Sequence, residues 1–163
     1  MRAGAVALLL VAIGPGAAAV QDGERRLTPD EAMALPVVPA GPGTSRLGAI
    51  ETRLLSGDPA AGGLYTIAIR VPPDTRIAAH THRDDRTAVV VQGVWHFGYG
   101  TTASTAASRA LPAGSFYTEP ADAAHFAWTG PEGATVYITG HGPTDTRYVE
   151  AGNDPAAHRT GKP

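Results

Sequence analysis

Three histidines carry the strongest chemical signal in this chain. His80 and His82 are separated by one residue in an extended segment, so both imidazoles point to the same side of a sheet. His125 comes much later, after a turn at Pro120. An imidazole from a neighbouring strand would complete a set of three nitrogen ligands, which suits borderline divalent metals. These residues predict one metal ion held inside a small β-structure.

Composition restricts both the ligands and the partners. The chain has no cysteine, which excludes thiolate metal sites and disulfides and leaves only nitrogen and oxygen ligands. Such a site accepts zinc, manganese, iron, nickel or copper, so the metal's identity stays open. A net charge of −2 argues against nucleic acid as a partner. The length of 163 residues, 43% of them hydrophobic, predicts one globular domain with a real core.

The elements that must position the histidines are strands. From Ile50 onward, apolar and polar residues alternate in short runs separated by proline or glycine turns. The pattern predicts strands over 64–71, 77–82, 87–92, 94–99, 115–119, 125–129 and 134–139, and a short extended piece near 147–149. Segment 101–109 is predicted to be a long excursion between strands. Eight or nine short strands with almost no helix indicate a closed or double-sheet all-β domain, and a sandwich without a site is the alternative.

The N-terminal residues have the pattern of a secretory signal peptide. Arg2 supplies a positive charge, Ala5 to Ile13 is apolar but too short to span a bilayer, and Ala17 and Ala19 are suited to cleavage before Val20. The alternatives are a buried N-terminal helix and an uncleaved anchor. We expect a signal peptide over 1–19, a periplasmic or secreted protein, and no stable membrane insertion after processing.

The mature chain divides into three parts. An extension over 20–48 contains a capping-box pattern at Thr28 to Glu31, which predicts a short helix ending before Pro36. The β-barrel is expected over 49–150, and a polar tail follows over 151–163.

Two segments resemble the two signatures of the cupin superfamily. Residues 74–93, Asp74-x5-His80-x-His82-x3-Arg86-x6-Gly93, follow the first signature, and residues 114–125, Gly114-x5-Pro120-x-Asp122-x2-His125, follow the second. The chain is similar to exported bacterial cupins that carry Asp-Arg after the His-x-His pair. The resemblance implies a jelly-roll barrel of six to eight strands that holds one divalent metal through His80, His82 and His125.

The signatures are not matched everywhere. Asp74 and Asp122 replace turn glycines, which is a mild change because aspartate tolerates turn geometry, and Thr129 replaces an asparagine. Arg86 stands where cupins place a metal-ligating glutamate. A guanidinium is cationic and has no acceptor, so it cannot be a ligand.

Glu119 is the best candidate to replace the missing carboxylate. It is predicted to be a fourth ligand or to pair with Arg86, and exposure to solvent is the third alternative. Arg86 is also a candidate anchor for an anionic substrate, and Gln92, at the same strand parity, is a weaker one. Tyr117 shares the parity of Glu119, and these two are the acid–base candidates.

Among the remaining polar residues, Asp84 and Asp85 are expected in a turn that faces water. His96 is expected to be a packing or surface residue, and His141 is not expected to be a ligand.

Two functions follow. The first is a metal-dependent enzyme of the dioxygenase, isomerase or lyase type, acting on a small polar or carboxylate substrate. The second is a non-catalytic periplasmic module that binds or senses a small ligand. A homodimer is compatible with the resemblance. The sequence does not decide between catalysis and binding.

Overall fold

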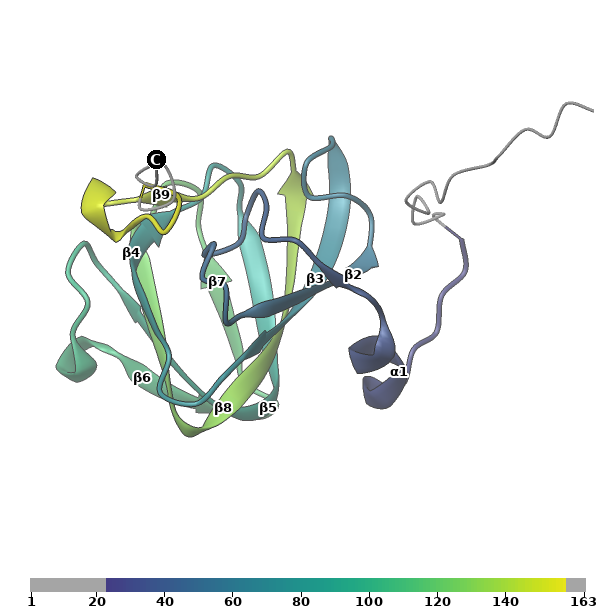
Figure 1. Cartoon of the computed structure of the whole chain (residues 1–163), viewed down its shortest axis with the longest axis horizontal. Coiled ribbons are helices and arrows are strands. Elements are labelled where there is room, and N and C mark those ends of the chain that lie inside the picture. The colour runs from purple at the N-terminus through teal and green to yellow at the C-terminus, as the bar shows by residue number, and fades with distance from the viewer. Residues whose placement is uncertain (1–22, 158–163) are drawn as a thin grey trace, which may run out of the picture.

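The computed structural model describes residues 23–157, so the predicted signal peptide lies outside the described residues. Within this range the chain forms one short α-helix, two 3-10 turns and nine strands (Figure 1). Their bounds are α1 Pro29–Ala34, β1 Val37–Val38, β2 Glu51–Ser56, β3 Gly63–Val71, β4 Arg76–Thr81, β5 Arg86–Tyr99, η1 Thr105–Ala107, β6 Arg109–Pro112, β7 Phe116–Glu119, β8 His125–Gly142, β9 Arg147–Tyr148 and η2 Ala151–Asn153.

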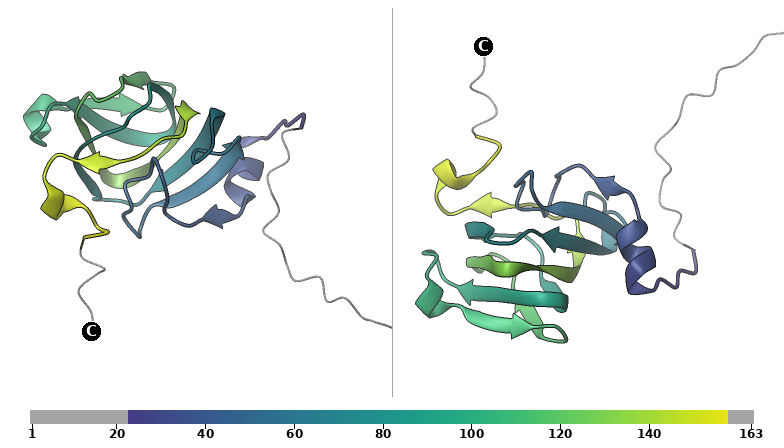
Figure 2. Two further views of the ribbon diagram at one scale, coloured as in Figure 1. Left: turned by 90° about the horizontal axis from the view of Figure 1, so that it is seen from above. Right: turned by 60° about the horizontal axis from the view of Figure 1, so that its bottom comes forward.

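Two long strands, β5 and β8, build the barrel because each takes part in two layers. The first half of β5 pairs with β7 and with the end of β8, which continues into β3, β2 and β1. The second half of β5 pairs with β6 and with the start of β8, which continues into β4 and β9. The views in Figures 1 and 2 show the resulting rolled barrel. The predicted all-β jelly-roll class is confirmed.

The change of layer requires irregular pairing in β5. The register with β8 shifts between Val90 and Gln92 and again between Gly93 and Trp95. Gly93 lies between the two shifts at a φ of 74°, and a Cβ there would lie 2.2 Å from the carbonyl oxygen of Gly133. Only glycine fits this backbone without strain. The inward-facing positions therefore change from even numbers (Arg86, Ala88, Val90) to odd numbers (Trp95, Phe97).

The short helix is confirmed with its predicted cap. The Thr28 hydroxyl accepts from the Glu31 amide, and the Glu31 carboxylate accepts from the Thr28 amide at 2.8 Å. The helix buries Ala32 against Leu55 and Ala68, on the outside of the barrel (Figure 2). Among residues 23–157, no helix is both long and apolar enough to cross a bilayer.

The strand predictions are confirmed in place but not always in extent. Segments 87–92 and 94–99 are one strand, β5, and segments 125–129 and 134–139 are likewise one strand, β8. Strands β1, β2 and β6 were not among the predicted ranges; β6 follows the 3-10 turn inside the excursion after Tyr99. Asp74 and Asp122 adopt φ values of 52° and 60°, the left-handed conformation that their glycine counterparts would take.

Candidate metal centre

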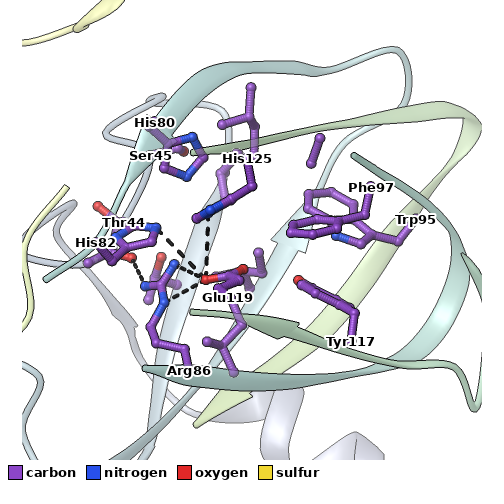
Figure 3. Close-up of a pocket in the computed structure, with 17 residues that line it drawn as sticks. Thr44, Ser45, His80, His82, Arg86, Trp95, Phe97, Tyr117, Glu119 and His125 are labelled. Atoms are coloured by element: carbon purple, nitrogen blue, oxygen red, sulfur yellow. Dashed lines mark hydrogen bonds and ion pairs between the residues drawn. The ribbon is translucent and has the colours of Figure 1, made fainter. Parts of the chain in front are cut away.

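The three predicted histidines converge inside the barrel. His80 lies on β4 and His125 opposite it at the start of β8, and the two are direct cross-strand partners. His82 follows β4 immediately. All three are buried, and their ligand nitrogens lie within 4.8 Å of one another. Figure 3 shows their rings gathered at one side of the cavity. The structure thus confirms that the three imidazoles meet.

Backbone carbonyls orient the rings. Nδ1 of His80 bonds to the Ala78 carbonyl at 2.7 Å, Nδ1 of His125 to the Ala123 carbonyl at 2.9 Å, and Nδ1 of His82 to the Asp145 carbonyl. A carbonyl only accepts, so each Nδ1 carries the proton and each Nε2 presents a lone pair. Nε2 of His82 and of His125 is buried without a hydrogen-bond partner. Unpaired buried lone pairs of this kind fit a divalent metal ion.

The histidines are neutral at physiological pH. Burial lowers the pKa of His80 to about 3, and the neighbouring His125 adds to this effect. Burial also lowers the pKa of His82, helped by the Arg86 guanidinium, and it lowers the pKa of His125. Because protons compete weakly for these nitrogens, the imidazoles are in the ligand form well below neutral pH.

Glu119 lies beside the histidines and pairs with Arg86. Its Oε2 accepts from Arg86 Nε at 2.6 Å and contacts Arg86 Nη2 as well. The same oxygen is 3.7 Å from His125 Nε2 and 3.9 Å from His82 Nε2. Burial raises the pKa of Glu119, but the Arg86 guanidinium, His125 and His80 together lower it by more, so the net pKa is lowered. Glu119 is therefore an ionised carboxylate, paired with Arg86 as predicted and buried rather than solvent-exposed.

Arg86 is held from a second side by the segment before the barrel. Its Nη1 donates to the Gly43 carbonyl at 2.8 Å, which places residues 43–45 over the cavity. With its guanidinium bonded to Glu119 and Gly43, Arg86 is occupied within the protein.

Asp84 was predicted to face water, but the structure shows that it does not. It is buried and accepts from the Tyr65 hydroxyl at 2.9 Å and from the Thr144 hydroxyl. Gly140 allows this arrangement, because a Cβ there would lie 2.5 Å from both Asp84 Oδ2 and the Tyr65 hydroxyl. Asp85 is exposed, as expected, and accepts from the Ala121 amide.

The prediction that Gln92 shares the inward parity of Arg86 is wrong. The register shift between Val90 and Gln92 turns this side chain to the exterior, where it is exposed and does not line the cavity. His96 also lies outside the cavity, stacked on Trp128 with ring centroids 3.5 Å apart. His141 is exposed.

Aromatic residues form the opposite wall of the cavity. Trp95 and Phe97 of β5 face Tyr117 of β7, and the Phe97 ring lies 4.2 Å from the Tyr117 ring and 5.4 Å from the His125 ring. The cavity has a volume of about 40 Å³, room for roughly three water molecules. Trp95 was expected in the core or rim, and Phe97 was not predicted as a cavity residue; both point inward because the inward parity of β5 changes after Gly93.

Comparisons with known proteins agree with this geometry. A family model for the ChrR cupin-like domain matches residues 42–145. No curated protein matches the chain significantly. Among solved structures, the polyketide cyclase RemF from Streptomyces resistomycificus matches with a TM-score of 0.64 and 16% identity over 85% of this chain and 94% of its own.

Two more structures extend the comparison. A candidate acetylacetone dioxygenase from Methylibium petroleiphilum matches with a TM-score of 0.55 and 22% identity, covering 82% of this chain and 85% of its own. An RmlC-like cupin from Shewanella frigidimarina matches with a TM-score of 0.54 and 19% identity, covering 74% and 93%. At these identities the structural matches establish a shared fold.

Proposed function

Because this chain belongs to the ChrR cupin-like family, we propose that it is a mononuclear metal-binding cupin that acts as a metal-dependent enzyme on a small polar or carboxylate substrate. One observation carries the proposal. Three buried histidines share one cavity, and two of their Nε2 atoms have no protein partner. His80, His82 and His125 would hold one divalent transition metal through these nitrogens.

A metal bound there would supply Lewis acidity at its open coordination positions. The protein's own residues do the rest. The Nδ1 bonds to backbone carbonyls fix the ring orientations. Residues 43–45 and the aromatic wall limit access of water. The cavity volume of about 40 Å³ admits only a small reacting group.

Glu119 could be an oxygen ligand of the metal or the ion-pair partner of Arg86. Its Oε2 is close enough to the His82 and His125 nitrogens to join them as an oxygen ligand, yet two Arg86 nitrogens already contact that oxygen. We favour the role of a partner that orients Arg86 and offsets positive charge. The substitution Glu119→Gln decides: a ligand role predicts severe loss of metal retention, and an outer role predicts a small loss.

Metal analysis of the purified protein tests the site itself. Wild-type protein should carry close to one metal per chain. His82→Ala leaves two imidazoles and should lose most of the metal, whereas His96→Ala, outside the cavity, should retain it. A folded wild-type protein that neither contains metal nor binds added zinc would overturn the proposal.

The second candidate is a non-catalytic module that binds or senses a small ligand. The observation in its favour is that both acid–base candidates are restrained: Glu119 is ion-paired, and burial raises the pKa of Tyr117 well above its usual value. A binding module should be stabilised by its ligand without converting it. Product formation from a small carboxylate library by wild-type protein, and its loss in His82→Ala, would favour the enzyme.

We also propose that the protein is exported, as its N-terminal sequence predicts. Expression with residues 1–22 intact, followed by mass spectrometry of the periplasmic fraction, should find the mature chain beginning at Val20. Retention of the full-length chain in the cytoplasm would contradict this.

A further inference from the structure

Two buried polar groups in the aromatic wall have no partner in the protein. They are the indole Nε1 of Trp95 and the hydroxyl of Tyr117. The two residues are 2% and 7% exposed, and both line the cavity that contains the histidines. Figure 3 shows them on the side of the cavity away from His82, with the Tyr117 hydroxyl directed toward Glu119. The metal-site proposal leaves both groups without a role.

Both groups are hydrogen-bond donors. An indole N–H donates and cannot accept. Burial raises the pKa of Tyr117 well above its usual value, and the nearby Glu119 carboxylate raises it further, so the phenol keeps its proton. Buried donors are normally paired with the protein, an ordered water or a ligand, because an unpaired one costs about 1–3 kcal/mol.

The donors come from different layers of the barrel yet meet at one point. Trp95 lies on the half of β5 that pairs with β6, whereas Tyr117 lies on β7, which pairs with the other half of β5. Both side chains nevertheless line the same cavity, on the side away from His82 (Figure 3). Phe97 fills the space between Tyr117 and His125. An acceptor reached by both donors would sit in the cavity that the three histidines also line.

The charges of the cavity favour an anion as the occupant. An imidazole that donates through Nδ1 and binds a metal through Nε2 is neutral, and the Glu119 carboxylate is offset by the Arg86 guanidinium, so these groups would leave the charge of a divalent metal uncompensated. Arg86 already donates to Glu119 and to the Gly43 carbonyl, so part of its donor capacity is used within the protein. Trp95 and Tyr117 are cavity residues whose buried donors have no protein partner.

We propose that Trp95 and Tyr117 form a carboxylate-binding subsite, in which both donate to one oxygen of a small carboxylate whose other oxygen faces the histidine cluster. This subsite narrows the substrate class of the proposed function to carboxylates, and it rests on that proposal for the metal bound by the histidines. A volume of about 40 Å³ restricts the ligand near the histidines to a group of acetate size.

The indole N–H signals provide a direct test, with acetate as the probe. Zinc-loaded protein labelled with nitrogen-15 should give two indole cross-peaks, and Trp128→Phe assigns them. Acetate should move the Trp95 peak downfield as its N–H gains a charged acceptor. The Trp128 peak should stay, because that N–H already donates to Ser108 Oγ at 3.0 Å. An unmoved Trp95 peak, with or without acetate binding, overturns the proposal.

Matched tyrosine substitutions test the second donor. Tyr117→Phe removes only the hydroxyl and should weaken acetate binding about tenfold. Tyr99→Phe is the control, since the Tyr99 hydroxyl is bonded to the Thr118 carbonyl and lies outside the cavity, and its affinity should stay within about twofold. Equal acetate affinity in wild type and Tyr117→Phe, with both folded, counts against the subsite.

The metal content of the same samples separates the two proposals. Bound zinc together with a silent Trp95 signal removes the subsite and leaves the metal centre in place. If zinc does not bind but acetate still moves the Trp95 signal and requires the Tyr117 hydroxyl, the subsite stands and the metal proposal falls.

Discussion

Removing Arg86 tests whether the Glu119 carboxylate depends on it. Arg86 is 3% exposed and Glu119 is 4% exposed, and the guanidinium donates to that carboxylate and to the Gly43 carbonyl. Arg86→Met keeps much of the side-chain volume but leaves an ionised carboxylate buried without a counter-charge. Breaking such a pair costs about 3–5 kcal/mol of unfolding free energy. At about 2–4 °C per kcal/mol, the melting temperature should fall by roughly 6–20 °C.

The measurement is calorimetric or urea unfolding of metal-free protein, so that metal binding does not enter. Arg70→Met is the control, because Arg70 is exposed on β3 and its loss should cost less than about 0.5 kcal/mol. The double variant Arg86→Met/Glu119→Gln removes both charges and should recover part of the loss. If Arg86→Met unfolds like Arg70→Met, the reasoning about this ion pair is refuted.

Three more predictions concern the histidines, the bound metal and the barrel backbone. The folded histidines have pKa values below the ordinary 6.5, so the unfolded chain takes up more protons as the pH falls. His80 and His82 together should cost metal-free protein about 3 kcal/mol of unfolding free energy between pH 7.5 and 5.5, and His125 should add to this loss. Equal stability in urea at both pH values would contradict this. Removing the metal with a chelator should lower the melting temperature, because the ion binds only the folded state. An unchanged melting temperature after verified metal removal would show that metal binding does not stabilise the fold. Gly93→Ala should lower the free energy of unfolding by more than about 2 kcal/mol, because the φ of 74° and the 2.2 Å approach to the Gly133 oxygen leave no room for a Cβ. Urea unfolding measures this loss, with Gly48→Ala as the control because a Cβ at Gly48 would lie in open space. Equal stabilities of the two variants would refute the prediction.

The local features of the fold could be read from the sequence. The capping box at Thr28 and Glu31 predicts α1 because both of its hydrogen bonds form within four residues. The turns at Asp74 and Asp122 follow from the tolerance of aspartate for positive φ. His80 lies on β4 and His82 directly follows it, and their imidazoles meet as the alternation of side chains along an extended segment predicts.

Features that depend on a partner strand could not be read in this way. The period-two rule places Gln92 inside, but β5 passes from one layer to the other there, and the two register shifts turn Gln92 out and Trp95 in. The local sequence predicts Asp84 in an exposed turn, but its carboxylate accepts from Tyr65 and Thr144, which lie 19 and 60 residues away in the sequence.

The sequence by itself determined which residues can bind a metal and that they lie on or directly beside strands, because residue type and the alternation of side chains are local properties. The tertiary structure alone decided that Glu119 is shared between Arg86 and the histidines, and that Trp95 and Tyr117 face them with unpaired donors. The physical reason is that these relations join different strands of the barrel. Their distances are set by how β5 and β8 bend from one layer to the other, and no local pattern contains that bend.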